Sequence, residues 1–261
     1  MEKGICFYFG YKTNPKERAK DIKNAGFTCV ITNADKKFNH QNGSIKAQIK
    51  NFKKNNLKLS SLHMRYNSKE LPSFWEDCKL GNKLEKKLIK DVKLAKKYGF
   101  KCVVVHLKGN PNEIGYNRLR RVLKVCEKLN IPLAIENTSN KDTFVETFKN
   151  VKSDYLKFCY DTGHGNVFNP EYDYLSIYLD KLICLHIHSN DGSSDQHTLN
   201  KYGNINWNEI AKKLAKCPNE LNLDYEILMV YRKNETSNEV LAETIKQANE
   251  LEKLIKKYKA N

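Results

Sequence analysis

Short runs of apolar residues recur along the chain and alternate with longer segments in which apolar residues follow helical spacing. The short runs are rich in Val, Ile, Phe, Tyr and Cys, as is typical of strands buried on both faces of a parallel sheet. They lie at about residues 4–9, 27–32, 57–63, 101–107, 131–136, 155–160, 182–188 and 223–228. Each run predicts one interior strand.

The segments between these runs predict amphipathic helices. Leu84, Leu88 and Val92, for example, fall on one face of a helix whose other face is rich in lysine. Asn14 precedes a proline at a point where a loop would lead into a helix, and Gly99 follows a helical pattern, where a left-handed cap is favoured. A last helix is expected over about 236–258.

Eight strands that alternate with about eight helices in 261 residues predict an α/β fold, a single (β/α)8 TIM barrel. No linker, low-complexity tract or shift in composition separates a second domain, so one barrel domain is expected over residues 1–261. A doubly wound open sheet with helices on both faces is the alternative that the same alternation permits.

Six of the eight predicted strands end in a residue that can bind a metal ion. The carboxyl ends of the strands of a barrel share one mouth, so residues far apart in the sequence would converge there. The candidates, at the strand ends or in the loops after them, are His63, His106, Glu136, Asp161, His164, His186, His188, Asp195, His197 and Glu226.

Imidazole and carboxylate groups are ligands that suit Zn²⁺, Mn²⁺ and related divalent ions. Asp161 and His164 are three residues apart, so a tight turn would aim both at one ion or at neighbouring ions. Asp195 and His197 would face the same side of an extended loop. One such residue alone is usually only hydrogen-bonded, but burying the whole set without a cation would be costly. The set therefore predicts a divalent metal site.

The chain carries a formal charge of +16, with 46 Lys and Arg against 30 Asp and Glu. A basic balance suits nucleic acid, an anionic membrane or a phosphorylated substrate. Most of the excess is lysine on predicted helix faces, which indicates a solvated surface, and Arg118, Arg120 and Arg121 form the one local cluster of arginines. The charge alone thus names no partner.

The eight cysteines show no Cys-x-x-Cys pair and are expected to be buried thiols in a reducing compartment. No apolar run is long enough to span a bilayer, and the first residues do not have the pattern of a secretory signal. A cytoplasmic protein without a membrane partner is expected. The sequence does not predict the oligomeric state.

The ordered set of strand-end residues resembles that of the xylose isomerase-like TIM barrels. This superfamily includes sugar and sugar-phosphate isomerases and epimerases together with endonuclease IV, an AP endonuclease of family 2. The resemblance extends over essentially the whole chain, from the first strand to Glu226 and the last helix. It implies a metal-dependent enzyme with a TIM-barrel fold, and two branches of the superfamily imply different reactions.

In the epimerase branch, one divalent ion such as Mn²⁺ or Mg²⁺ is held by a Glu, an Asp, a His and a Glu. These positions match Glu136, Asp161, His188 and Glu226. The resemblance implies that the ion polarises a sugar carbonyl. It also makes Glu136 and Glu226 the catalytic pair that exchanges a proton on the adjacent carbon, one on each face.

In the endonuclease IV branch, up to three Zn²⁺ ions would be bound, and a zinc-bound hydroxide would attack the phosphate beside an abasic site in DNA. The resemblance implies that His63, His106 and Glu136 hold the first ion. The second would be held by the epimerase-type quartet. The third would be held by His164, Asp195 and His197, and Tyr66 stands where the nuclease has a tyrosine that helps to probe the duplex.

His186 and His188 project to the same side of one predicted strand, so their spacing alone does not decide which is the ligand. We favour His188, because the sequence His188-Ser-Asn-Asp fits the nuclease pattern, and assign His186 to the barrel interior or to substrate contact. The other expected substrate contacts are Tyr66, Asn137, and Arg65 or Lys108, either of which would neutralise a substrate phosphate.

We therefore expect a metal-dependent isomerase or epimerase of a small sugar or sugar phosphate. The loops after Tyr66 and around residues 201–203 are short compared with those that grip DNA in the nucleases, which favours this reading. An AP endonuclease that acts on abasic DNA is the alternative, because all nine nuclease-type ligand positions carry the expected residue type. A barrel that only binds a sugar is a third hypothesis, which the intact pair of glutamates disfavours.

Overall fold

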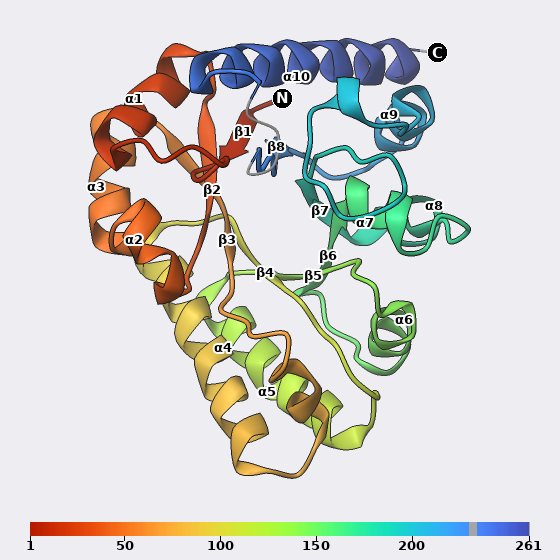
Figure 1. The fold of residues 1–261 in the computed structure, drawn as a ribbon. Helices are drawn as coiled ribbons and strands as arrows, with labels where there is room; N and C mark the ends of the chain where they lie inside the picture. Colours follow the sequence, from red (N-terminus) through yellow and green to blue (C-terminus); the bar gives the residue numbers. More distant parts are fainter. Residues whose placement is uncertain (230–233, 261) are drawn as a thin grey trace.

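The computed structural model of the chain describes residues 1–229 and 234–260. Eight parallel strands form one sheet in the order β7-β6-β5-β4-β3-β2-β1-β8 (Figure 1). Their bounds are β1 (Lys3–Cys6), β2 (Cys29–Asn33), β3 (Lys58–His63), β4 (Cys102–Val105), β5 (Leu133–Glu136), β6 (Leu156–Asp161), β7 (Leu182–His186) and β8 (Leu223–Tyr225).

The sheet curls round so that its two end strands meet. Ile187, just beyond β7, donates its backbone N–H to the carbonyl of Asp224 at 2.8 Å and accepts from the N–H of Glu226 at 2.9 Å. These bonds join the carboxyl ends of β7 and β8 and bring the sheet round into a barrel. The predicted TIM barrel is confirmed, and the open doubly wound sheet is excluded.

Helices cover the outside of the barrel (Figure 1). They are α1 (Pro15–Asn24), α2 (Asn39–Asn42), α3 (Ile45–Lys54), α4 (Lys79–Tyr98), α5 (Glu113–Leu129), α6 (Lys141–Asn150), α7 (Thr162–Val167), α8 (Tyr174–Tyr178), α9 (Trp207–Ala215) and α10 (Ser237–Lys259). Short 3-10 turns are η1 (Lys36–Phe38), η2 (Leu71–Trp75), η3 (Leu179–Lys181) and η4 (Asn200–Tyr202). None of the described helices has the length and apolar character needed to cross a bilayer.

The helix ends follow local sequence signals. The side chain of Asn14 accepts a hydrogen bond from the N–H of Lys16, which caps α1 at its first turn. Helix α4 ends at Gly99, whose φ of 86° is the left-handed conformation that glycine adopts without strain. Thr236 and Glu239 form a reciprocal capping box at the start of α10.

Two apolar clusters stabilise the barrel. The larger one lies between the sheet and the helices and includes outward-facing strand residues such as Val103, Leu133 and Leu185. The smaller cluster fills the interior of the barrel and consists of Cys102, Val104, Ala134, Cys159 and Cys184. Because side chains alternate along a strand, the next inward positions on these strands reach the mouth.

Candidate metal centre

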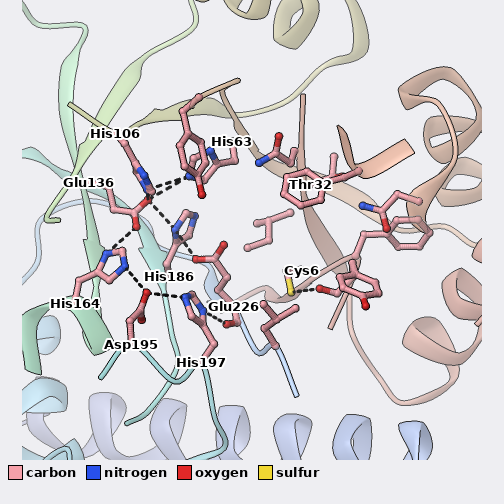
Figure 2. A pocket seen from close by; sticks show the side chains of 18 residues that line it. Cys6, Thr32, His63, His106, Glu136, His164, His186, Asp195, His197 and Glu226 are labelled. Carbon is pink, nitrogen blue, oxygen red and sulfur yellow. Dashed lines mark hydrogen bonds and ion pairs between the residues drawn. The ribbon is translucent and has the colours of Figure 1, made fainter. Parts of the chain in front are cut away.

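The carboxyl ends of the strands place the candidate ligands in one mouth, where all of them except Asp161 and His188 line a cavity of about 220 Å³ (Figure 2). β3 ends at His63, β5 at Glu136, β6 at Asp161 and β7 at His186. His106 directly follows β4, and Glu226 follows β8. Each of these residues lies at the carboxyl end of its strand or directly after it. Because these strand ends share one mouth of the barrel, the residues converge although they are far apart in the sequence.

The first group of donors, called here the histidine-pair group, consists of His63, His106 and Glu136. The Nε2 atoms of the two histidines lie 3.1 Å apart. Nε2 of His106 lies 3.1 Å from Oε2 of Glu136, and Nε2 of His63 lies 3.7 Å from the same oxygen. Burial, together with His106, lowers the pKa of His63 to about 4, so its imidazole is neutral and has a lone pair for a cation.

The second group, called the inner group, consists of Glu136, Asp161, His186 and Glu226. Nδ1 of His186 lies 3.1 Å from an Oε2 atom of each glutamate. Burial opposes ionisation of Glu136, but His106 and His186 outweigh it and hold the pKa of Glu136 well below its ordinary value. Glu136 is therefore a carboxylate at neutral pH and belongs to both groups.

The third group, called the outer group, consists of His164, His188, Asp195 and His197. Oδ2 of Asp195 lies 3.3 Å from Nε2 of His164 and 3.3 Å from Nε2 of His197. The rings of His188 and His197 stack with their centroids 3.8 Å apart. Although burial raises the pKa of Asp195, its hydrogen bonds to His164 and His197 lower it well below the ordinary value.

The outer and inner groups are in direct contact. Nδ1 of His164 lies 3.1 Å from Oε1 of Glu136, and Nε2 of His188 lies 3.0 Å from Oδ1 of Asp161. Figure 2 shows this continuous chain of contacts from His106 through Glu136 and His164 to Asp195 and His197. The three groups thus form one extended set of donors.

The residues present fit divalent cations. Three buried atoms have no hydrogen-bond partner among the described atoms, although other possible metal-ligand atoms lie near them. They are Oε2 of Glu136, Nδ1 of His164 and Nδ1 of His186. Imidazole nitrogens and carboxylate oxygens are the only types of ligand atom in these groups. They face one another as ligands do around a shared cation. Ligation itself stays a prediction.

The structure differs from the expected quartet in one histidine. His186, not His188, lies with Glu136, Asp161 and Glu226, whereas His188 reaches only Asp161 of that quartet and otherwise belongs to the outer group. The two histidines do share one side of the chain. His186 ends β7 deep between the two glutamates, and His188 lies one step further out beside His197.

The expected substrate contacts divide into those that line the cavity and those that do not. His186 and Tyr66 line it, and burial raises the pKa of Tyr66 to about 12, so its hydroxyl group stays protonated. Asn137 lies behind Asp161: it donates to the carbonyl of Asp161 at 2.9 Å and accepts from its N–H at 2.7 Å. Its contacts are those of a support for a ligand rather than of a substrate contact.

Arg65 and Lys108 are not among the residues that line this cavity. The guanidinium of Arg65 is bound to the fully buried carboxylate of Asp91, to which Nε donates at 2.7 Å. Lys108 is exposed. The expectation that one of them neutralises a phosphate in the mouth therefore finds no support in the geometry.

The arginine cluster also faces away from the mouth, on α5. Arg118 is buried and donates to the carbonyls of Phe74 at 2.7 Å and Glu76 at 2.6 Å. Its neighbours Arg120 and Arg121 pair with surface glutamates of α5 and α4. Arg118 holds η2 and its following loop against α4 and α5, and none of the three arginines lines the cavity at the mouth.

One wall of the cavity was missed from the sequence. It is formed by the ends of β1 and β2 and the segments after them, and its side chains include Phe7, Tyr8, Thr32, Asn33, Phe38 and Asn42. Asn33 directly follows the strand predicted over about 27–32, and this position was the signal that could have revealed the wall. The loop residues have no such signal, because only the fold brings them to the mouth.

Comparison with known proteins agrees with this architecture. The protein y4fM of Sinorhizobium fredii is 31% identical over 111 residues, which cover 40% of this chain and 36% of that protein, so the match spans about a third of the relative's length. A solved D-tagatose 3-epimerase-like protein is 15% identical, covers 98% of this chain and 99% of its own, and superposes with a TM-score of 0.78.

The D-psicose 3-epimerase of Clostridium cellulolyticum, solved with D-tagatose, is 16% identical, with a TM-score of 0.69 and coverage of 100% of this chain and 96% of its own. At such identities the likeness shows the fold alone. The family model described as xylose isomerase-like TIM barrel matches residues 19–249. The chain therefore belongs to the xylose isomerase-like TIM-barrel family.

Proposed function

We propose that the protein is a divalent-metal-dependent isomerase or epimerase of a small sugar. The observation that carries this proposal is the pair of carboxylates, Glu136 and Glu226, held on either side of His186 within one cavity. The sugar epimerases with the same fold support it, because one of them was solved with a bound ketose. The metal and the individual sugar are part of what the experiment must decide.

Glu136, Asp161 and Glu226 would hold the cation together with a histidine from the end of β7. A divalent cation bound there would supply Lewis acidity to the carbonyl and hydroxyl oxygens of a sugar. His186 has a ring nitrogen within 4.8 Å of oxygens of all three carboxylates, which supports it as that histidine. His188, which contacts Asp161 at 3.0 Å, is the alternative that the family resemblance favours.

Glu226 is suited to take the proton from the carbon next to the carbonyl. Burial opposes its ionisation, but His186 and His197 hold the pKa of Glu226 well below its ordinary value, so it carries the base form at neutral pH. Its side chain keeps 25% exposure toward the cavity, whereas that of Glu136 keeps 1%. Glu136 would exchange the proton on the opposite face of the same carbon, or would remove it when the reaction runs in reverse.

The rest of the cavity would orient the sugar. Tyr66, Thr32, Asn33 and Asn42 line it with hydroxyl and amide groups, which match the hydrogen-bonding groups of a polyol. Aromatic side chains such as Tyr8 would pack against the C–H face of the sugar. Such a mixture of a few polar groups on apolar walls is typical of sites for small molecules.

The experiment that tests the proposal is a turnover assay on metal-free protein reloaded separately with Mn²⁺, Mg²⁺, Co²⁺ or Zn²⁺. A panel of ketoses, aldoses and their phosphates would be incubated with each form, and new epimers or isomers would be separated by chromatography. Metal-dependent interconversion that is lost in Glu226→Gln supports the proposal. Absence of product with every metal and every sugar contradicts it.

A zinc phosphodiesterase that acts at abasic sites in DNA is the second candidate. It is favoured by the outer group, because His164, Asp195 and His197 supply donors that a centre with one metal does not need. An abasic duplex in the same set of assays separates the two functions. Incision that requires Zn²⁺ and falls steeply with salt would favour the nuclease.

A further inference from the structure

A second set of possible ligands lies below the mouth, inside the barrel. Cys159 of β6 and Cys184 of β7 are paired across neighbouring strands, and both thiols are buried. Their Sγ atoms and a ring nitrogen of His186 all lie within 4.8 Å of one another. No disulfide joins them, and all eight cysteines of the chain are free.

A third thiol borders this set. Cys102 of β4 lies near Cys159 and Cys184 but is not among the three donors that lie within 4.8 Å of one another. Cys102 is buried at the same level of the barrel, in the small interior cluster that also contains Cys159 and Cys184. Two thiols and one imidazole form the close set, and Cys102 would complete the donor types of a Cys₃His site.

His186 links these thiols to the mouth. Its Nδ1 atom lies 3.1 Å from carboxylate oxygens of Glu136 and Glu226, so Nε2 is the nitrogen left for the thiol side. In metal sites, a histidine ligand usually donates its second N–H to a carboxylate, which fixes the orientation of the ring. His186 has the same disposition, with carboxylate oxygens 3.1 Å from Nδ1 on one side of the ring and the thiols near its other nitrogen.

Packing alone accounts for the burial of the thiols but not for their grouping around an imidazole. Cysteine is among the residues most often found in protein interiors, and Cys126 and Cys217 of this chain are buried without such a neighbour in any described group. Cys159 and Cys184 differ from them because each lies beside the other and beside His186.

We propose that Cys159, Cys184 and His186 form a binding site for a thiophilic cation of the Zn²⁺ or Cd²⁺ class, with Cys102 as the nearest additional donor. Binding of one divalent cation displaces the protons of the Cys159 and Cys184 thiols, together with the Nε2 proton of His186 when its ring is an imidazolium, and these protons leave to solvent. Two cation–sulfur bonds and one cation–nitrogen bond form, and no atom is oxidised or reduced. A cation reaches the site through the mouth, because His186 lines the cavity.

The site shares His186 with the inner group, but its other donors are thiols, whereas the other donors at the mouth are imidazole and carboxylate. Occupying it would hold His186 on the thiol side and so fix the ring between Glu136 and Glu226. Loading of the thiol site is therefore expected to change the affinity of the inner group for its own cation. The thiol site does not depend on which reaction takes place at the mouth.

Cadmium titration of the fully reduced, metal-free protein tests the proposal. Cd²⁺ bound to thiolate absorbs in the ultraviolet through charge transfer, whereas Cd²⁺ bound to imidazole and carboxylate does not. The wild type should develop this band and bind one more equivalent of Cd²⁺ than the double variant Cys159→Ser/Cys184→Ser, in which the band should be absent. Absence of the band in the wild type, or its persistence in the double variant, overturns the proposal.

Four control variants separate this site from other sources of the same signal. Cys78→Ser and Cys6→Ser remove the two partly exposed thiols, and Cys126→Ser removes a buried thiol on α5. All three should keep the band. Glu136→Gln, which damages the mouth, should keep it as well, so that failure of the metal centre at the mouth is distinguishable from failure of the thiol site.

If the double variant does not fold, X-ray absorption at the zinc edge of the wild-type protein tests the same proposal. After loading with excess Zn²⁺, sulfur scatterers at about 2.3 Å should appear beside the nitrogen and oxygen ligands. A spectrum with nitrogen and oxygen ligands alone would contradict the thiol site without the use of any variant.

Discussion

Nδ1 of His164 lies 3.1 Å from Oε1 of Glu136, and this contact joins the outer group of donors to the other two. The other oxygen of the same carboxylate lies 3.1 Å from His106 and from His186. Glu136 is thus the one residue shared by the histidine-pair group and the inner group. Any cations bound in the mouth would be coupled through it.

Glu136→Gln should therefore impair both groups at once. The amide keeps the shape of the side chain but removes the negative charge and replaces one acceptor by a donor, so metal content should fall and turnover should drop by about 10³-fold or more. Metal analysis and kcat of the purified variant check this. Glu113→Gln, on the exposed first turn of α5, is the matched control, and full turnover in Glu136→Gln would refute the assignment.

Gly163→Ala should disturb the outer group without removing a ligand. A Cβ atom at Gly163 would lie 1.9 Å from Cε1 of His188, so the imidazole must shift and its contacts with Asp161 and His197 must change. We expect about a 10- to 100-fold loss of metal affinity, comparable to the loss of a residue that orients a ligand. Zinc titration of the metal-free variant measures it. Unchanged affinity for every cation would show that the position of His188 is unimportant for binding.

Arg65→Met should destabilise the fold rather than alter substrate binding. The substitution leaves the fully buried carboxylate of Asp91 without its cation, which costs about 3–5 kcal/mol for a broken buried pair. Lys108→Ala, at an exposed position, should change the free energy of unfolding by about 0.5 kcal/mol or less. Urea unfolding measures both. A rise in KM for phosphorylated sugars only, at unchanged stability, would restore the role of Arg65 as a phosphate contact.

Glu252 predicts a pH dependence of stability. Its carboxylate receives hydrogen bonds from Lys256, Lys3 and the terminal amine of Met1, which hold the pKa of Glu252 well below its ordinary value. A lowered folded-state pKa contributes stability above the unfolded-state pKa of about 4.3, and this contribution is lost as the pH falls through the folded-state value.

Glu252→Gln should accordingly lower Tm at neutral pH, and the difference from the wild type should shrink in acid. Thermal unfolding of both proteins over a pH series checks this. Glu250→Gln, on the exposed face of α10, provides the comparison. A difference in Tm that stays constant across the series would show that the charge of Glu252 is not what stabilises this contact.

The fold could be predicted because its signals are local and repeated. Alternation between buried runs and amphipathic segments fixes the order of strands and helices, and the strand ends His63 and Glu136 fall where the pattern places them. Strand lengths were overestimated: β8 ends at Tyr225, where the pattern continued to 228. Apolar residues after a strand can be buried by loops, so burial alone does not mark where pairing ends.

The site was predicted as a set of residues but not in its detailed grouping. Two residues on one side of a strand, His186 and His188, are equivalent in sequence, and only their depth in the barrel separates them. The burial of Arg118 under the loop after η2 also depends on long-range packing. Cys159 and Cys184 could have been placed below the mouth, since each precedes an inward-facing candidate ligand by two positions.

Exchange of substrate hydrogen with deuterated water tests the central claim most directly. The metal-loaded protein would be incubated in D₂O with ketohexoses, and ¹H NMR would follow the proton on the carbon next to the carbonyl. We predict that this signal disappears as an epimer or isomer accumulates, and that exchange is abolished in Glu136→Gln and Glu226→Gln. No exchange on any sugar with any divalent metal, together with Zn²⁺-dependent incision of an abasic duplex, would contradict the account.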